Sequence, residues 1–234
     1  MSIEWEAFSG CSSLTSIIIP SNVTGIGEYA FQGCIGLTSI IVDENNKEFD
    51  SRYNCNAIIR TTTNALIAGC KNTTIPNDIV IIDRGAFRGC SSLTNISIPN
   101  SVTSIEWGAF DGCSSLTSII IPDSVKSMGD YAFNECIGLK SVTISKGISS
   151  IGDSAFNCCS SLTSIEIPEG VTSIGGQGFG FCSSLTSVVV PDSVTSIGIS
   201  AFNGCSNLIS ITISDSLASI GLCAFKDCGS LTSI

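Results

Sequence analysis

Cysteine and the acidic residues are the side chains through which this chain could do chemistry. The 234 residues include 13 cysteines and 20 Asp and Glu, but no histidine. Histidine is the commonest general base in enzymes and a common zinc ligand, so its absence excludes Ser-His-Asp and Cys-His arrangements within this segment. Disulfides, thiolate metal sites and paired carboxylates are the chemistry that the composition leaves open.

Nine of the cysteines follow a fixed spacing. Each stands three residues after a phenylalanine, and they are Cys11, Cys34, Cys90, Cys113, Cys136, Cys159, Cys182, Cys205 and Cys228. If successive copies stack, neighbouring Cβ atoms lie about 4.8 Å apart, beyond the roughly 3.5 to 4.5 Å of a disulfide. We therefore predict buried free thiols that donate weakly to loop carbonyls, and not disulfides or a metal site. Cys55 and Cys70 lie outside this column, and a disulfide between them is an open alternative to free thiols.

The acidic residues recur beside turns, as at Asp123, Glu169, Asp192 and Asp215. This regular placement is typical of a solvated edge and not of an acid and base pair, so we predict neither enzyme activity nor a cofactor. The net charge of −10 makes nucleic acid an unfavourable partner. No run reaches the roughly 20 apolar residues of a membrane span, so we expect no membrane insertion by this segment.

The cysteines belong to a repeat of 23 residues. Its clearest marker is a phenylalanine that recurs as Phe8, Phe31, Phe87, Phe110, Phe133, Phe156, Phe179, Phe202 and Phe225. In one copy, Leu116, Ile119 and Ile121 match the pattern LxxLxL, whose last two positions alternate along a strand, and Val125 and Met128 add a second apolar pair. We predict a leucine-rich repeat solenoid, a horseshoe or a rod, dominated by β structure, with a parallel sheet of one short strand per coil.

The spacing changes once, between Phe31 and Phe87, which lie 56 residues apart. This distance is two periods plus ten residues, so we place an insertion at about residues 50–71. Two short apolar runs in it, residues 56–60 and 65–69, predict a protruding β-hairpin. The segment is locally basic through Arg52, Arg60 and Lys71. Its two arginines are candidate loop contacts for a ligand, although an insertion can equally be tolerated decoration.

Residues 1–234 form one array in which both ends cut through a repeat unit. The segment from Met1 to Phe8 is the end of one unit, and Ile234 lies within a predicted strand. Solenoids normally carry polar caps on their end coils. We therefore expect a fragment truncated at both ends, whose open ends could support end-to-end self-association.

Four sequence elements recur together along the chain. They are the loop Ala-Phe-x-x-Cys, the strand Leu-x-x-Ile-x-Ile-Pro, the return Val-x-x-Ile-Gly and, once, the stretch 50–59. Together they resemble the BspA-like leucine-rich repeat family over essentially the whole chain, the stretch being similar to a longer unit of that family. The resemblance implies a non-enzymatic interaction module of a bacterial cell-surface or secreted protein, an adhesin for extracellular-matrix proteins, host cells or other bacteria. Its partner would be a protein or glycan on such a surface; the alternative is a spacer array that displays another domain and has no ligand.

One column of strand residues is the candidate ligand-binding surface. It lies between the two core positions of each predicted strand, varies from coil to coil, and consists of Ile18, Ile41, Ser97, Ile120, Thr143, Glu166, Val189 and Thr212. Strand propensity and solubility alone are the competing explanation for such residues. Trp107, three residues before its phenylalanine, is a further candidate contact, because acidic residues occupy this position in other coils.

Overall fold

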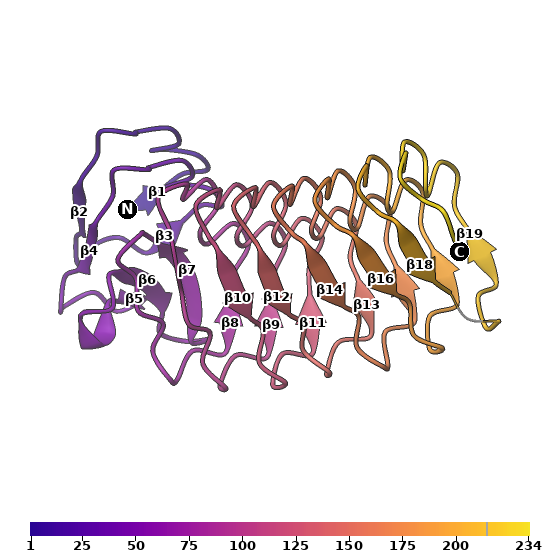
Figure 1. Ribbon diagram of the computed structural model, residues 1–234. Helices are drawn as coiled ribbons and strands as arrows, with labels where there is room; N and C mark the ends of the chain where they lie inside the picture. Colours follow the sequence, from indigo (N-terminus) through magenta and orange to yellow (C-terminus); the bar gives the residue numbers. More distant parts are fainter. Residues whose placement is uncertain (214) are drawn as a thin grey trace.

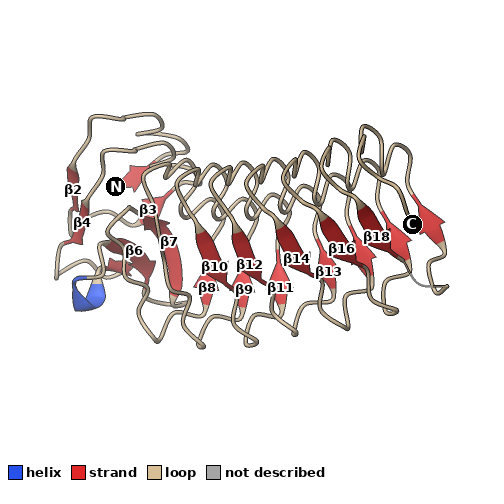
Figure 2. Ribbon diagram, viewed as in Figure 1, coloured by secondary structure: helices blue, strands red, loops and turns tan. Residues whose placement is uncertain are grey.

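The coils stack along one axis into a rod. A computed structural model describes residues 1–213 and 215–234, with the two termini at opposite ends of the stack (Figure 1). The array makes about nine turns, and Figure 2 shows that strands and loops make up nearly all of it. The predicted solenoid of parallel strands is confirmed.

The first strand of a coil is the one that the repeat predicts, but it does not form at residues 94–99, so Ser97 of the predicted column lies outside a strand. Equivalent strands of neighbouring coils pair in parallel with serine beside serine, as for Ser118 with Ser141 and Ser164 with Ser187. Because the period is constant, each core position meets its own copy in the next coil. These strands are β2 (Ser16–Ile19), β4 (Ser39–Val42), β10 (Ser118–Ile120), β12 (Ser141–Thr143), β14 (Ser164–Glu166), β16 (Ser187–Val189) and β18 (Ser210–Thr212). They form three sheets, β2–β4, β10–β12 and β14–β16–β18.

A second short strand, which the sequence pattern did not predict, comes from the Val-x-x-Ile return. In β13, for example, Ser150 is exposed and Ile151 is buried. These strands are β1 (Ser2–Ile3), β3 (Gly25–Ile26), β8 (Ile81–Ile82), β9 (Ser104–Ile105), β11 (Ser127–Met128), β13 (Ser150–Ile151), β15 (Ser173–Ile174), β17 (Ser196–Ile197) and β19 (Ser219–Ile220). The two sets of strands are two walls of each coil, and their inward side chains fill the space between them.

The inserted segment forms an antiparallel hairpin within the wall of the solenoid. Its elements are β5 (Phe49–Asp50), the single helical turn η1 (Arg52–Asn54), β6 (Ala57–Arg60) and β7 (Ala65–Gly69). β6 pairs with β7, and β7 pairs in parallel with β8, in a sheet of order β11-β9-β8-β7-β6-β5. The prediction that the hairpin protrudes is wrong, because Ile58, Ile59 and Leu66 are all 0% exposed.

The hairpin divides the interior into two cores. Ile58 and Ala68 pack with the first two coils, whose core includes Phe31. Ile59 and Leu66 belong to the long core of the later coils. Both faces of the hairpin are therefore covered by apolar side chains, as in strands buried on both sides.

The phenylalanine rings stack through the interior in two runs. Phe8 and Phe31 form the first run, and the rings from Phe87 to Phe225 form the second, with neighbouring centroids 5.0 to 5.5 Å apart. Gly69 of β7 lies against the Phe87 ring, where a Cβ would collide with it. The hairpin thus needs a glycine at this point in order to cover the end of the second run.

Candidate functional site

The column of eight predicted contact residues is exposed throughout, but the structure divides it. Ile18 and Ile41 pair across β2 and β4, which form a sheet of their own. The inserted hairpin lies between these coils and the later ones. The other six residues lie on consecutive coils, and we call them the strand face: Ser97, Ile120, Thr143, Glu166, Val189 and Thr212.

Two aliphatic side chains stand out on the strand face. Ile120 is 67% exposed and Val189 is 64% exposed, whereas Ile119 and Val188 beside them are buried. Covering apolar surface is favourable by about 25 cal/mol per Å². The strand face therefore offers apolar contact points beside the small hydroxyl side chains of the paired serines, such as Ser118 and Ser141.

Two hollows lie along the strand face where the ladder of paired strands is interrupted. One of about 400 Å³ lies between residues 95–98 and β10. The other, of about 360 Å³, lies between β12 and β14 and is lined by Thr143, Lys146, Glu166 and Glu169. None of the ion pairs formed by the described residues involves these three charged groups. The second hollow therefore presents charges of both signs to a partner.

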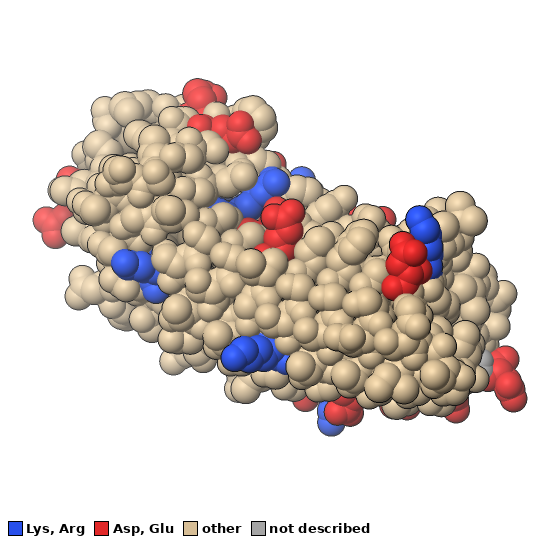
Figure 3. Space-filling model, turned by 45° about the horizontal axis from the view of Figure 1, so that its top comes forward, with Lys and Arg blue, Asp and Glu red and all other residues tan. Residues whose placement is uncertain are grey.

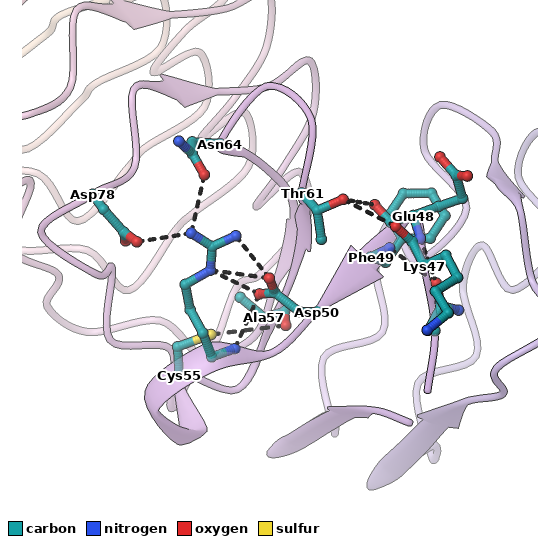
Figure 4. A network of polar contacts seen from close by, with 11 residues as sticks. Lys47, Glu48, Phe49, Asp50, Cys55, Ala57, Thr61, Asn64 and Asp78 are labelled. Carbon is teal, nitrogen blue, oxygen red and sulfur yellow. Dashed lines mark hydrogen bonds and ion pairs between the residues drawn. The ribbon is translucent and has the colours of Figure 1, made fainter. Parts of the chain in front are cut away.

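Arg52, one of the predicted loop contacts, is engaged within the protein. Its guanidinium donates to carboxylate oxygens of Asp50 and Asp78, each at 2.7 Å, and to Oδ1 of Asn64 at 3.0 Å (Figure 4). These interactions, with the hydrogen bond to Asp50 the largest cause, raise the pKa of Arg52 above its usual value. Arg52 therefore fixes the inserted segment to the coil that follows it.

Arg60, the other predicted loop contact, lies over the ring of Phe49, with its Cζ atom 5.6 Å from the ring centroid. Together with Arg84 and Arg88 it lines a cavity of about 130 Å³ at the junction of the first coils and the hairpin. All four arginines of the chain lie between residues 52 and 88. Three of them meet at this junction, whereas Arg52 of the predicted basic segment is paired with two carboxylates.

Trp107 belongs to an aromatic cluster on the loop edge, the edge formed by loops that lead from the second strand of one coil to the first strand of the next. Its ring centroid lies 5.9 Å from that of Tyr29 and 5.2 Å from that of Tyr131. Arg88 lies over Tyr29 and Trp107, at 5.1 and 5.2 Å from the centroids, and pairs with Asp111 at 3.0 Å. Sequence reasoning missed Arg88 and both tyrosines. The signal for the tyrosines was their position two residues before the repeated phenylalanine, where two other coils carry glycine.

A line of polar side chains runs along the loop edge and holds Arg88 in place. Asn134 donates to Asp111 at 2.7 Å, and Asn157 donates to Asn134 at 3.0 Å. Burial raises the pKa of Asp111 above its usual value, against the opposing effects of Asn134 and Arg88. In Figure 3 this edge carries few charged side chains, with acidic and basic groups side by side near the middle of the view.

The cysteine column consists of free thiols that are buried in most coils, as predicted. From Cys113 to Cys228, each column thiol donates to the carbonyl oxygen of the phenylalanine one coil earlier, at 3.1 to 3.3 Å. Cys11 is exposed and Cys228 is only partly buried, and these two cysteines lie in the first and last coils of the described stack. Burial raises the pKa of Cys90 and Cys205 to about 12, so these thiols stay protonated at neutral pH.

The alternative disulfide between Cys55 and Cys70 does not form. Both are buried free cysteines, and the thiol of Cys70 donates to the carbonyl oxygen of Asn56 at 3.5 Å. Among residues 1–213 and 215–234, no group of three Cys, Asp or Glu is placed to hold a metal ion. In the same part of the chain, no helix has the length and apolar character that crossing a membrane requires.

Solved structures of bacterial proteins share this fold. A leucine-rich repeat protein from Eubacterium ventriosum aligns with a TM-score of 0.84 and 26% identity over 95% of this chain and 60% of its own. A leucine rich cell surface protein from Faecalibacterium prausnitzii gives 0.69 and 35% identity over 94% of this chain and 55% of its own. A leucine rich repeat protein from T. pallidum gives 0.65 and 32% identity over 75% of this chain and 82% of its own. The chain thus spans 60% or less of the length of the first two proteins.

The repeat itself matches a family model over the whole chain. The model, described as a BspA type leucine rich repeat region, matches residues 1–67, 65–185 and 172–234. A search of curated proteins gives no match. With the loop, strand and return of this repeat present in successive coils, the chain belongs to the BspA-type leucine-rich repeat family.

Proposed function

We propose that this chain is a non-enzymatic interaction module of a bacterial cell-surface or secreted protein, and that its strand face binds a protein on a host or bacterial surface. An extracellular-matrix protein is the partner class that we favour. The observation that carries the proposal is the exposure of Ile120 and Val189 on a regular wall of small hydroxyl side chains.

The family supports a role in protein interaction or as a surface protein, and its arrays are typically non-enzymatic. One similar solved structure, from Faecalibacterium prausnitzii, is described as a leucine rich cell surface protein. The chemistry of the chain supports the same proposal, because the column thiols are directed into internal hydrogen bonds. The groups that can meet a partner are therefore the exposed ones.

The hollow between β12 and β14 supplies specificity in this proposal. Lys146 follows β12 on one side of the hollow. Glu166 of β14 and Glu169, in the turn after β14, lie on the other side. Complementary charges select and orient a partner, while apolar residues such as Ile120 and Val189 contribute affinity when covered. A partner that bridges this hollow would contact both kinds of residue.

Binding of the purified chain to immobilised fibronectin, fibrinogen, laminin and collagen tests the proposal. We expect saturable binding to at least one of them, and a loss of affinity of about tenfold or more in the double variant Thr143→Arg, Glu166→Lys. The control is Glu44→Lys, which makes the same charge change as Glu166→Lys at an exposed turn after β4.

Equal binding by the wild type and the double variant would place the contact elsewhere. No saturable binding by the wild type to any of the four proteins would contradict the proposal and favour a spacer array. Circular dichroism and the thermal midpoint should be the same for the wild type and both variants, because all the changed residues are exposed.

A further inference from the structure

The aromatic cluster on the loop edge has features that stacking of the coils does not require. The position two residues before the repeated phenylalanine has a positive φ in every coil, and tyrosine, a bulky residue that seldom adopts this conformation, occupies it at Tyr29 and Tyr131, with φ of 59° and 58°. Gly85 and Gly108 occupy this position in the two coils between them and adopt it freely. A Cβ on Gly85 would lie 2.6 Å from the Tyr29 ring, so this glycine makes room for the ring. Two large rings at a position where the other coils carry glycine, serine, glutamine, glutamate or cysteine, with space provided for one of them, indicate a role beyond the fold.

Arg88 is fixed at the centre of the cluster with its charge compensated. It lies over Tyr29 and Trp107 and pairs with Asp111, whose side chain is 10% exposed. Asn134 in turn holds Asp111 by a hydrogen bond. A guanidinium held in this way retains N–H groups in fixed directions and is an oriented hydrogen-bond donor.

The cluster borders a hollow of about 450 Å³. Trp107 and Tyr131 supply rings to its lining, and Gln32, Asn134 and Glu135 supply polar groups. Oε1 of Gln32 is buried, yet it accepts no hydrogen bond from the described residues. The Gln32 side chain lines the hollow, and its amide can turn to meet a ligand hydroxyl there.

The combination of groups favours a sugar ring as that ligand. The C–H face of a hexose packs on an aromatic ring, and its hydroxyls both donate and accept hydrogen bonds. An anion is disfavoured, because Arg88 is already paired and both Glu135 and the net charge of −10 repel it. A purely apolar group would offer no hydrogen bond to Gln32 and Glu135, which line the hollow. We propose that the loop edge binds a neutral hexose unit of a glycan in the hollow between Trp107, Tyr131 and Gln32.

This proposal deepens the proposed function by adding a glycan to the ligands of an interaction module, but the two can fail separately. The glycan site lies on the loop edge and includes no residue of the strand face. The double variant Thr143→Arg, Glu166→Lys should therefore bind sugar as the wild type does.

Isothermal titration calorimetry of the purified chain with neutral linear hexasaccharides of glucose, mannose and galactose tests the glycan site. We expect saturable binding of at least one of them. Trp107→Ala should weaken that binding about tenfold or more. The matched control is Trp5→Ala, because Trp5 occupies the same repeat position in the first coil and is 63% exposed. Its binding should equal that of the wild type.

Tyr131→Gly keeps the test valid if Trp107→Ala does not fold. Glycine stands at this position in two other coils and adopts positive φ without strain, so the variant should keep the thermal midpoint and lose affinity for sugar. Failure of the wild type to bind any neutral hexasaccharide would overturn the proposal. So would equal losses in Trp5→Ala and Trp107→Ala, or Trp107-dependent binding only to an anionic glycan or to a protein.

Discussion

Replacing Phe133 by alanine is expected to lower the free energy of unfolding by about 3 to 5 kcal/mol. The ring of Phe133 is fully buried and stacks between those of Phe110 and Phe156, at 5.1 and 5.5 Å. Its removal leaves a cavity that the neighbouring coils cannot close, because their backbones are fixed by hydrogen bonds from coil to coil. Denaturant unfolding followed by circular dichroism measures the loss.

Phe181→Ala is the matched control for this prediction. Phe181 lies on the loop edge, two residues after the ladder residue Phe179, and is 45% exposed. Its removal should cost less than about 1 kcal/mol. A loss of this small size for Phe133→Ala would contradict burial of the phenylalanine ladder.

The chain is expected to unfold near pH 10, because six column thiols resist ionisation in the folded state. Burial is the largest cause of the raised pKa in every one of them, and they are Cys90, Cys113, Cys136, Cys159, Cys182 and Cys205. An unfolded thiol ionises at about pH 8.5, so the unfolded state loses these protons first as the pH rises. The stabilisation is therefore fully present below about pH 8.5 and is lost progressively up to the folded pKa, about 12 for Cys90.

The expected size of this effect follows from proton linkage. Each such thiol destabilises the fold by about 1.4 kcal/mol per pH unit well above pH 8.5, so six amount to about 12 kcal/mol by pH 10. A domain is normally stable by roughly 5 to 15 kcal/mol. Circular dichroism across pH 7 to about 11, in reducing buffer, measures the transition.

Cys136→Ala should make the alkaline transition less steep, since one titrating group is gone. Cys223→Ala is the control, because Cys223 is exposed and outside the column, and it should leave the transition unchanged. Full stability of the wild type at pH 11 would mean that the column thiols do not resist ionisation.

The core of the coils could be predicted from the sequence because residues that are one repeat apart in the sequence come into contact when the coils stack. Phe110 and Phe133 are one period apart, and their rings lie in contact for that reason. The same argument predicted that Cys136 and its equivalents are free thiols bonded to loop carbonyls. Strict repetition makes each such inference hold for the next coil as well.

The second strand and the place of the hairpin could not be predicted in the same way. A two-residue strand such as Ser127–Met128 is too short for an alternation of polar and apolar residues to reveal it. It forms because the backbone of the neighbouring coil lies beside it and pairs with it in parallel. The apolar run at residues 57–59 is continuous. Such a run is compatible with a strand that is buried on both faces and equally with a protruding hairpin. Only the packing of two cores against it decides between these arrangements.

The contact between Tyr29 and Trp107 escaped prediction because the insertion separates their coils in the sequence. Tyr29 and Trp107 are 78 residues apart, yet the loop edge continues past the hairpin, with Gly33 donating to the carbonyl oxygen of Arg88 at 3.1 Å. The predicted column of contact residues, by contrast, is divided at the same place, because the hairpin lies between the coil of Ile41 and the coil of Ser97. An insertion can therefore interrupt one wall of a solenoid and leave another intact.

We expect the column thiols to be shielded inside the stack, so that only surface residues can meet a partner. Alkylation of the native chain at pH 8, read residue by residue by mass spectrometry, tests it most directly. We expect rapid labelling of the exposed Cys11 and Cys223, and labelling of Cys113, Cys159 and Cys182 only after unfolding. Rapid labelling of these three column thiols in the native chain, or their recovery as disulfides, would contradict the account.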